Sequence, residues 1–348
     1  MASTPLGTES ADKAAAIRRP RPSPVSSARR RTDRLVGTSR SIQRAVEQVA
    51  VASRGRFPVW IQGEEGIERE LIARLIHNQS EWVTNGFFAL DAAVVPEALL
   101  RRELFGCEAG AIPTLPSEYD GAFARTRGGT VLIEHIEAVP KDVQQSIASA
   151  LDAEEYPRVG SGAPLPLDCR VIASSALGIE ELSAGSALLP ELSERLRLLV
   201  IRIPPLRDRR EDIIPLAAHI LSLVRSEYEH EVGQNCPVRS FSRDALDRLR
   251  SYGWPGNERE LREQIRAAVR LARGDELGPE DLLLSWESSE DIPAFRDAKR
   301  TFEHEYVTRV LRICRGNISR AARIAKKDRK DFYDVMRRNS INPQDFRH

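Results

Sequence analysis

The sequence predicts an α/β protein in which a parallel sheet has helices on both faces, followed by a helical region and an all-α C-terminal module. Short apolar runs alternate with helical patterns from residue 35 to about residue 207. This alternation is typical of a parallel sheet, because a helix usually returns the chain between parallel strands. Beyond residue 207 the apolar residues recur at helical spacing, and residues 294–348 are basic and helical.

Five short runs have the apolar character of buried strands. They are Val59–Ile61, Phe87–Leu90, Thr130–Glu134, Cys169–Ser174 and Leu199–Ile203. Helical patterns lie between them, at Ser41–Ala52, Glu68–Asn78, Pro96–Phe105, Lys141–Ala153 and Leu189–Leu196. Further helices are expected at Arg210–His230, Ser242–Tyr252 and Glu258–Ala272, before a linker around Gly274–Pro293.

Composition sets the broad class of the protein. The 348 residues are enough for two or three domains, and the net charge of +1 does not indicate a class of binding partner. The 4 cysteines have no paired spacing and no histidine at metal-binding distance, so we assign no metal ligands and expect reduced thiols in a cytoplasmic protein. No apolar run approaches the length of a membrane span, and the first residues lack the apolar core of a signal peptide.

Residues 1–33 are rich in Ala, Ser, Pro and Arg and are expected to be a disordered basic arm. Two roles remain open for this arm. It either keeps the protein in solution or binds a phosphate backbone loosely.

A glycine turn between a predicted strand and a predicted helix has the layout of a phosphate-binding loop. Its sequence is Gly63-Glu64-Glu65-Gly66-Ile67-Glu68-Arg69-Glu70. A working loop of this type reads GxxxxGK[ST], in which backbone N–H groups and a lysine surround the phosphates. Here Glu68 replaces the second glycine and Arg69 replaces the lysine. The candidate nucleotide-binding residues of the loop are Gly63, Gly66, Arg69 and Glu70, although an ordinary strand–turn–helix remains an alternative on this stretch alone.

Seven stretches in sequence order resemble the central AAA+ domain of NtrC-type activators of sigma-54 RNA polymerase. They are Leu35–Ser39, Ala73–His77, Glu103–Ala111 (ELFGCEAGA), Gly128–Ile133, Arg170–Ala173, Ile203–Arg209 together with Glu211–Ile213, and Trp254–Leu261 (WPGNEREL). The resemblance implies a P-loop-type AAA+ core at residues 34–207, a helical lid at 208–284 and a linker at 285–293. It also implies a Fis-like helix-turn-helix domain at 294–348.

The family hydrolyses ATP by positioning and by charge neutralisation, so the resemblance implies ATP or ADP with Mg²⁺ as cofactors. Several groups that this chemistry requires are replaced. The family's Asp-Glu pair is Glu134-His135 here, and Leu189 stands in place of the first arginine of the finger region. The remaining catalytic candidates are Glu134, His135 and Arg195, and Arg259 matches the sensor arginine of the lid. Whether nucleotide still binds stays open at this point.

The family engages sigma-54 through a GAFTGA loop, and the matching segment here is altered. It consists of Gly110, Ala111, Ile112, Pro113, Thr114 and Leu115. Ile112 replaces the phenylalanine that contacts the polymerase, and Pro113 fixes a backbone angle in a tip that must move. The resemblance therefore implies a sigma-54 loop whose contact is weakened.

The C-terminal segment resembles a Fis-like helix-turn-helix. Residues 299–339 contain 13 Lys and Arg against 5 Asp and Glu, a net charge of +8 that favours binding to phosphates. Asp328 is expected to cap a recognition helix at Arg329–Arg338, and Lys326 occupies a turn where glycine is usual. A charged, solvated helical bundle is the alternative. The candidate DNA-binding residues are Asn317, Ser319, Arg320, Arg329, Lys330, Tyr333 and Arg337.

Together these features predict a DNA-binding transcriptional regulator whose AAA+ core is impaired in ATP hydrolysis and in sigma-54 remodelling. Two other functions remain open: an active sigma-54 activator with altered catalytic residues, and an AAA+ scaffold subunit in hetero-oligomers. The implied partners are DNA, sigma-54 RNA polymerase and other AAA+ subunits, in a homo- or hetero-oligomer without a membrane. The sequence does not indicate the DNA site, the input signal, or whether the protein activates or represses transcription.

Overall fold

The computed structural model describes residues 34–112, 117–272, 274–284, 303–304, 306–311, 314, 316–339 and 341–346. The predicted arm at 1–33 and the predicted linker at 285–293 lie outside these residues. The chain divides into two compact units, one ending at Pro205 and the other beginning at Leu206.

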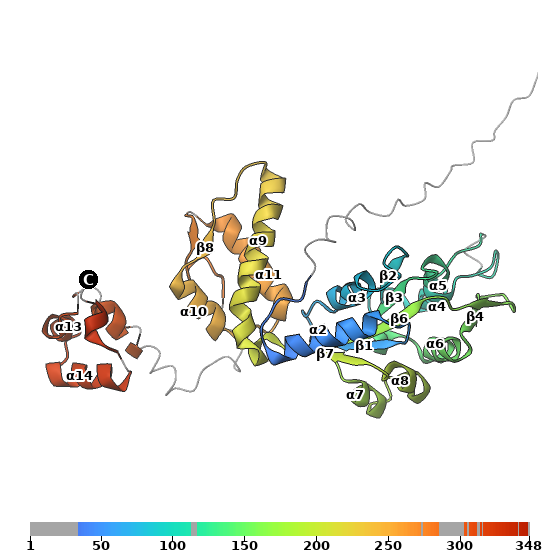
Figure 1. Ribbon diagram of the computed structural model, residues 1–348, viewed down its shortest axis with the longest axis horizontal. Coiled ribbons are helices and arrows are strands. Elements are labelled where there is room, and N and C mark those ends of the chain that lie inside the picture. The colour runs from blue at the N-terminus through green and yellow to red at the C-terminus, as the bar shows by residue number, and fades with distance from the viewer. Residues whose placement is uncertain are drawn as a thin grey trace, which may run out of the picture. The chain divides into compact units, whose positions relative to one another are not determined.

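The first unit is built on a parallel sheet, as predicted (Figure 1). In the described residues its strand order is β2-β3-β6-β1-β7, and every neighbouring pair runs parallel. The strands are β1 (Val59–Gln62), β2 (Phe87–Asp91), β3 (Thr130–Glu134), β6 (Arg170–Ser175) and β7 (Val200–Arg202). The five predicted strands are confirmed, with ends that differ by at most one residue.

Helices cover both faces of this sheet, because alternate strand residues point to opposite sides. Ile61, Leu132 and Ile172 belong to one hydrophobic core, and Trp60, Val131 and further residues belong to another. The first core is covered by α2 (Arg40–Ser53) and α3 (Arg69–Asn78), whereas the second is covered by α4 (Glu97–Phe105), α6 (Lys141–Ala153) and α8 (Pro190–Leu196). The five helices predicted between strands are confirmed.

Short elements of the first unit were not predicted from the sequence. They are α5 (Ala122–Arg125), η2 (Ile136–Ala138), α7 (Ile179–Ala184) and an antiparallel pair formed by β4 (Glu155–Pro157) and β5 (Pro164–Pro166). The β4–β5 pair contains three prolines, which in a sequence argue against a strand because proline cannot donate to a ladder.

The second unit begins with the helical region. Its elements are η3 (Leu206–Asp208), η4 (Arg210–Asp212), α9 (Ile213–Val232), β8 (Ser240–Phe241), α10 (Arg243–Ser251), α11 (Asn257–Leu271) and β9 (Glu276–Leu277). Two predictions need correction here. The α-helix begins at Ile213 rather than Arg210, after two 3-10 turns, and residues 276–277 of the predicted linker pair with β8 as a strand.

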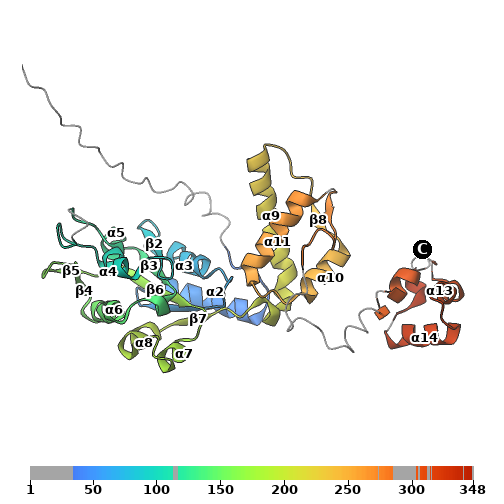
Figure 2. The ribbon, with the colours of Figure 1, turned by 180° about the vertical axis from the view of Figure 1, so that it is seen from behind.

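The C-terminal part of this unit has a hydrophobic core of its own. Residues 306–311 are helical, and α13 (Ile318–Ile324), α14 (Arg329–Arg338) and η5 (Pro343–Phe346) follow (Figure 2). Val310, Ala322 and Phe332 lie in the buried core that joins them. The helix predicted at Arg329–Arg338 is confirmed. Of the helices that the structure describes, none combines the length and the apolar character needed to cross a membrane.

Candidate nucleotide site at the carboxyl edge of the sheet

The candidate nucleotide site lies where several parallel strands end. The loop 63–68 joins β1 to α3, and β2 and β3 finish at the same edge with Asp91 directly opposite Glu134. Ligands of open α/β sheets bind outside the carboxyl ends of the strands, so this edge is the expected place for chemistry.

The side chain of Arg69 is folded into the loop that precedes it. It is only 4% exposed although it carries a charge. Its Nη1 donates to the Gly63 carbonyl at 2.8 Å, and both terminal nitrogens contact Glu65 Oε1 at 3.1 Å. Its Nη2 also lies 2.9 Å from His135 Nε2. The guanidinium that replaces the lysine is thus bound by the protein itself.

The backbone of the loop is also partly committed to internal contacts. The N–H of Ile67 donates to the Glu64 carbonyl at 3.1 Å, and the N–H of Arg69 donates to the Ile67 carbonyl at 2.8 Å. Gly63 donates its N–H to Ser175 of β6, and Gly66 has a φ of 83°, which glycine adopts without strain. These three backbone N–H groups therefore already have acceptors within the protein.

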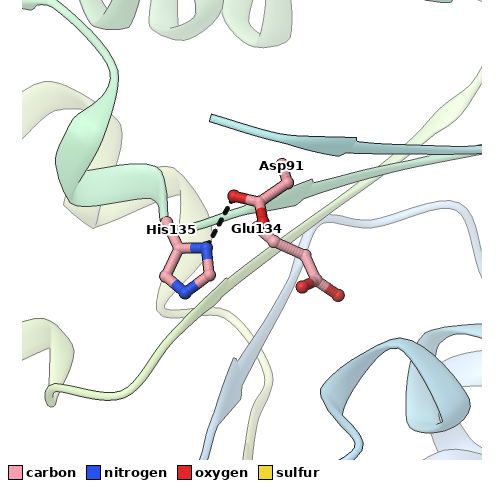
Figure 3. Close-up of side chains that lie close together, drawn as sticks. All are labelled: Asp91, Glu134 and His135. Atoms are coloured by element: carbon pink, nitrogen blue, oxygen red, sulfur yellow. Dashed lines mark hydrogen bonds and ion pairs between the residues drawn. The ribbon is translucent and has the colours of Figure 1, made fainter. Parts of the chain in front are cut away.

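His135 lies at the centre of a charged network. Its Nδ1 lies 2.7 Å from Asp91 Oδ1 (Figure 3). Its Nε2 lies 3.2 Å from Glu65 Oε1. Burial lowers the pKa of His135, but the hydrogen bonds and charges of Asp91 and Glu65 outweigh burial, so the pKa is raised above its ordinary value. His135 has a left-handed φ of 51°, a conformation that costs a non-glycine residue on the order of 1 kcal/mol.

The carboxylates around His135 differ in their surroundings. Burial raises the pKa of Glu65, but hydrogen bonding to and attraction by Arg69 outweigh it, so the pKa of Glu65 is lowered. Burial raises the pKa of Glu134, and the charges of Glu70 and Asp91 add to this shift against the attraction of Arg69. Among the described residues, none forms a hydrogen bond or an ion pair with the Glu134 carboxylate.

In the structure, neither ring nitrogen of His135 is free of contacts. A general base must offer a free lone pair to the proton it removes. Both ring nitrogens of His135 already face hydrogen-bonding partners, and no carboxylate occupies position 135. Glu65 and Glu68 also bring negative charge to the loop.

The remaining predicted residues of the ATPase site are Glu70, Arg195 and Arg259. Glu70 is paired with Arg74 on α3, with Nε 2.7 Å from Oε1. Arg195 is on α8 and forms an ion pair with Asp152 of α6. Arg259 is exposed on α11, in the second unit.

The predicted sigma-54 loop is described only in part. Gly110 is exposed with a left-handed φ of 75°, and Ala111 and Ile112 are partly buried. Pro113, Thr114 and Leu115 lie outside the described residues.

The candidate DNA-binding residues lie on the surface of the C-terminal helices. Asn317 caps α13, with its Oδ1 accepting from the N–H of Arg320 at 3.0 Å. Asp328 caps α14 by accepting from the N–H of Lys330 at 2.7 Å. The side chains of all seven candidates are exposed: Asn317, Ser319, Arg320, Arg329, Lys330, Tyr333 and Arg337.

Two members of the network were missed as site residues in the sequence. Asp91 is the last residue of β2, and Glu65 lies in the middle of the glycine turn. Asp91 follows a predicted strand directly, which is a usable signal because parallel strands end at one edge. The contact of Glu65 with His135 joins residues 70 positions apart and has no local signal.

Comparison with known proteins follows the same division of the chain. Residues 35–202 match the family model of the Sigma-54 interaction domain, and residues 207–295 match that of the AAA+ ATPase lid domain. The chain is 30% identical over 314 residues to the transcriptional regulatory protein GlrR of Escherichia coli strain K12, covering 90% of this chain and 69% of GlrR. It is 34% identical over 263 residues to the DNA-binding transcriptional regulator NtrC of Klebsiella pneumoniae, covering 76% of this chain and 54% of NtrC.

A solved structure shows the same fold. NtrX from Brucella abortus in complex with ATP is 27% identical, with a TM-score of 0.64, and the match covers 88% of this chain and 70% of NtrX. These findings confirm the predicted AAA+ core and helical lid. The chain spans between about half and about two thirds of the length of these relatives.

Proposed function

We propose, from the premise that the chain belongs to the sigma-54 interaction family of AAA+ transcriptional regulators, that it is a DNA-binding regulator with an impaired ATPase core. One observation carries the proposal. The Arg69 guanidinium, at the position of the phosphate-binding lysine, is buried against Gly63, Glu65 and His135. The residue that should neutralise phosphate charge is therefore neutralised by the protein.

The impairment is proposed to affect hydrolysis most strongly. Phosphoryl transfer depends on positioning and electrostatic stabilisation, so a displaced cation and a missing base both raise the barrier. His135 cannot replace the carboxylate base while Asp91 and Glu65 hold its ring. Arg195, the remaining finger candidate, is engaged by Asp152. Since the loop fits phosphate poorly, any binding of ATP or ADP with Mg²⁺ is proposed to be weak.

DNA binding is proposed to reside in residues 294–348. The basic residues of α13 and α14 are exposed, whereas Phe332, Val335 and Met336 of α14 are buried. One face of α14 therefore packs and the opposite face remains available to phosphates and base edges. We propose that domains begin at about residues 34, 208 and 294, with a linker from about residue 285. Such a chain would serve in the cytoplasm as a repressor, a co-regulator or a subunit of a homo- or hetero-oligomer.

The test is ATP turnover by the purified chain. We expect a rate at least about 10⁴-fold below that of a hydrolytically active relative, because a cation, a base and one arginine are each worth orders of magnitude. The losses need not add, since parts of one site fail together. A rate within about tenfold of the relative, measured side by side, would support the active-ATPase alternative instead.

A further inference from the structure

The carboxyl edge of the sheet brings together three side chains that are metal ligands in many proteins. Oxygen atoms of Asp91 and Glu134 and a ring nitrogen of His135 all lie within 4.8 Å of one another. Figure 3 shows the ring of His135 and the carboxylate of Asp91 facing each other at the ends of neighbouring strands. Ligands at about 2.1 Å from a metal are separated by roughly 3 to 4 Å, so small side-chain rotations would close this set around one ion.

We propose that Asp91, Glu134 and His135 form a nucleotide-independent site for a divalent transition-metal ion such as Zn²⁺. This is distinct from a magnesium site that a bound nucleotide completes, since the imidazole supplies a protein ligand that Mg²⁺ does not prefer. Imidazole suits Zn²⁺, whereas carboxylate and water suit Mg²⁺. Three protein ligands would leave a coordination position for water.

The charges around the site favour a divalent cation. The network contains three carboxylates, those of Asp91, Glu134 and Glu65, and one guanidinium, that of Arg69. These four groups have a net charge of −2 when His135 is neutral. Glu134 is the member without a protein partner, because its half-buried carboxylate makes no hydrogen bond or ion pair among the described residues. A cation between these groups would satisfy it.

The surroundings also supply the outer contact that metal-binding histidines usually have. Nδ1 of His135 faces Asp91, and Nε2 faces Glu65 at 3.2 Å. When Nδ1 binds the metal, Nε2 carries the ring proton and donates it to the Glu65 carboxylate. Arg69 then keeps its bonds to Gly63 and Glu65 and gives up its contact with the ring. Glu65 is therefore a positioning residue for His135.

The experiment is a calorimetric titration of Zn²⁺ into the full chain, stripped of metal and free of nucleotide. We expect one saturable equivalent. Asp91→Asn, Glu134→Gln and His135→Asn should each abolish it or weaken it by at least about 10-fold to 100-fold, and Glu65→Gln should weaken it by about 10-fold to 100-fold. His135→Glu should shift the preference from Zn²⁺ towards Mg²⁺. Glu181→Gln and His230→Ala, exposed residues outside the network, are matched controls and should bind as the parent does.

Several results would overturn the proposal. They are an absence of saturable Zn²⁺ binding by the parent, Zn²⁺ binding unchanged in Glu134→Gln and His135→Asn, or Mg²⁺ competing on equal terms. Circular dichroism of each variant shows whether it folds. If a ligand variant does not fold, Glu65→Gln still decides, because an unchanged affinity would contradict the assigned contact. The ATP turnover rate is measured separately. A failure of the metal-site proposal can therefore be distinguished from a failure of the proposed ATPase impairment.

Discussion

At the scale of single residues, an arginine in place of a lysine changes what the phosphate loop can do. Lysine is a flexible point charge, whereas the planar guanidinium bonds several acceptors at once. Arg69 uses this geometry to hold Gly63, Glu65 and His135 together. The arginine therefore keeps the positive charge of the loop, but this charge contacts groups of the protein itself.

Restoring residues of the loop should separate nucleotide binding from hydrolysis. We expect Glu68→Gly with Arg69→Lys to raise the affinity for ATP without restoring turnover, because position 135 still lacks a carboxylate. Adding Glu134→Asp, His135→Glu and Leu189→Arg should then raise turnover. ATP-binding calorimetry and phosphate release measure the two effects.

The matched control for this series is Arg74→Lys, which changes an arginine on the same helix that pairs with Glu70. It should leave ATP affinity as it is in the parent. If the double variant gains no affinity, the contacts of Arg69 are not what keeps nucleotide out.

At the scale of elements, the helices and strands that could be predicted from the sequence are those that local residue patterns determine. The strands and the helices between them follow apolar periodicity, and the cap at Asp328 was predicted from its residue type. The cap at Asn317 was not predicted. Strand β9 was missed because two residues carry no periodicity and its partner, β8, lies 36 positions earlier. The Asp91–His135 contact was missed for the same reason, since only the sheet register brings these residues together.

The turn between α13 and α14 carries a local strain that can be removed. Lys326 occupies a turn where glycine is usual, and its φ is 49°. Lys326→Gly should stabilise the two helices by about 1 kcal/mol, because glycine adopts this conformation without a clash. Hydrogen exchange of the α13 and α14 amides in the full chain measures the change.

Lys327→Gly is the control for this prediction, since Lys327 is the next residue and is absent from the positive-φ positions. It should bring no gain in protection. Equal protection in both variants would mean that the turn is not strained.

Helix α14 should anchor DNA mainly through phosphates. Arg329 and Lys330 are exposed at its first turn, so changing either to Ala should weaken binding on all sequences alike and lower the salt dependence by about one unit of slope. Binding measured across a salt series tests this. Arg250→Ala, an exposed position on α10, is the control and should have no effect.

Asp331 and Asp334 on the same helix qualify this expectation. Both are exposed, and a carboxylate can accept a hydrogen bond from the amino group of cytosine but repels phosphate. A salt response close to zero would mean that base contacts of this kind dominate over phosphate contacts.

At the scale of the whole molecule, the departures from the family's pattern are unevenly distributed among the AAA+ core, the lid and the C-terminal helices. The AAA+ core and the lid keep their fold, and the C-terminal helices keep an exposed basic surface. The changes concentrate on charged groups at the sheet edge and on the loop at 110–115. On the proposed function, a core impaired in hydrolysis would still offer surfaces for assembly with other AAA+ subunits.

This division leads to a prediction for transcription. Remodelling of a closed sigma-54 promoter complex needs energy from hydrolysis and a mobile contact loop, and both are altered here. We expect the chain alone to form no open complexes on a sigma-54 promoter in vitro, with an active relative as the positive control. The restored variant described above should regain turnover before activation, because Ile112, Pro113 and Thr114 remain in the loop. Robust transcripts from the unmodified chain with ATP would show that Arg69 and His135 leave the ATPase working.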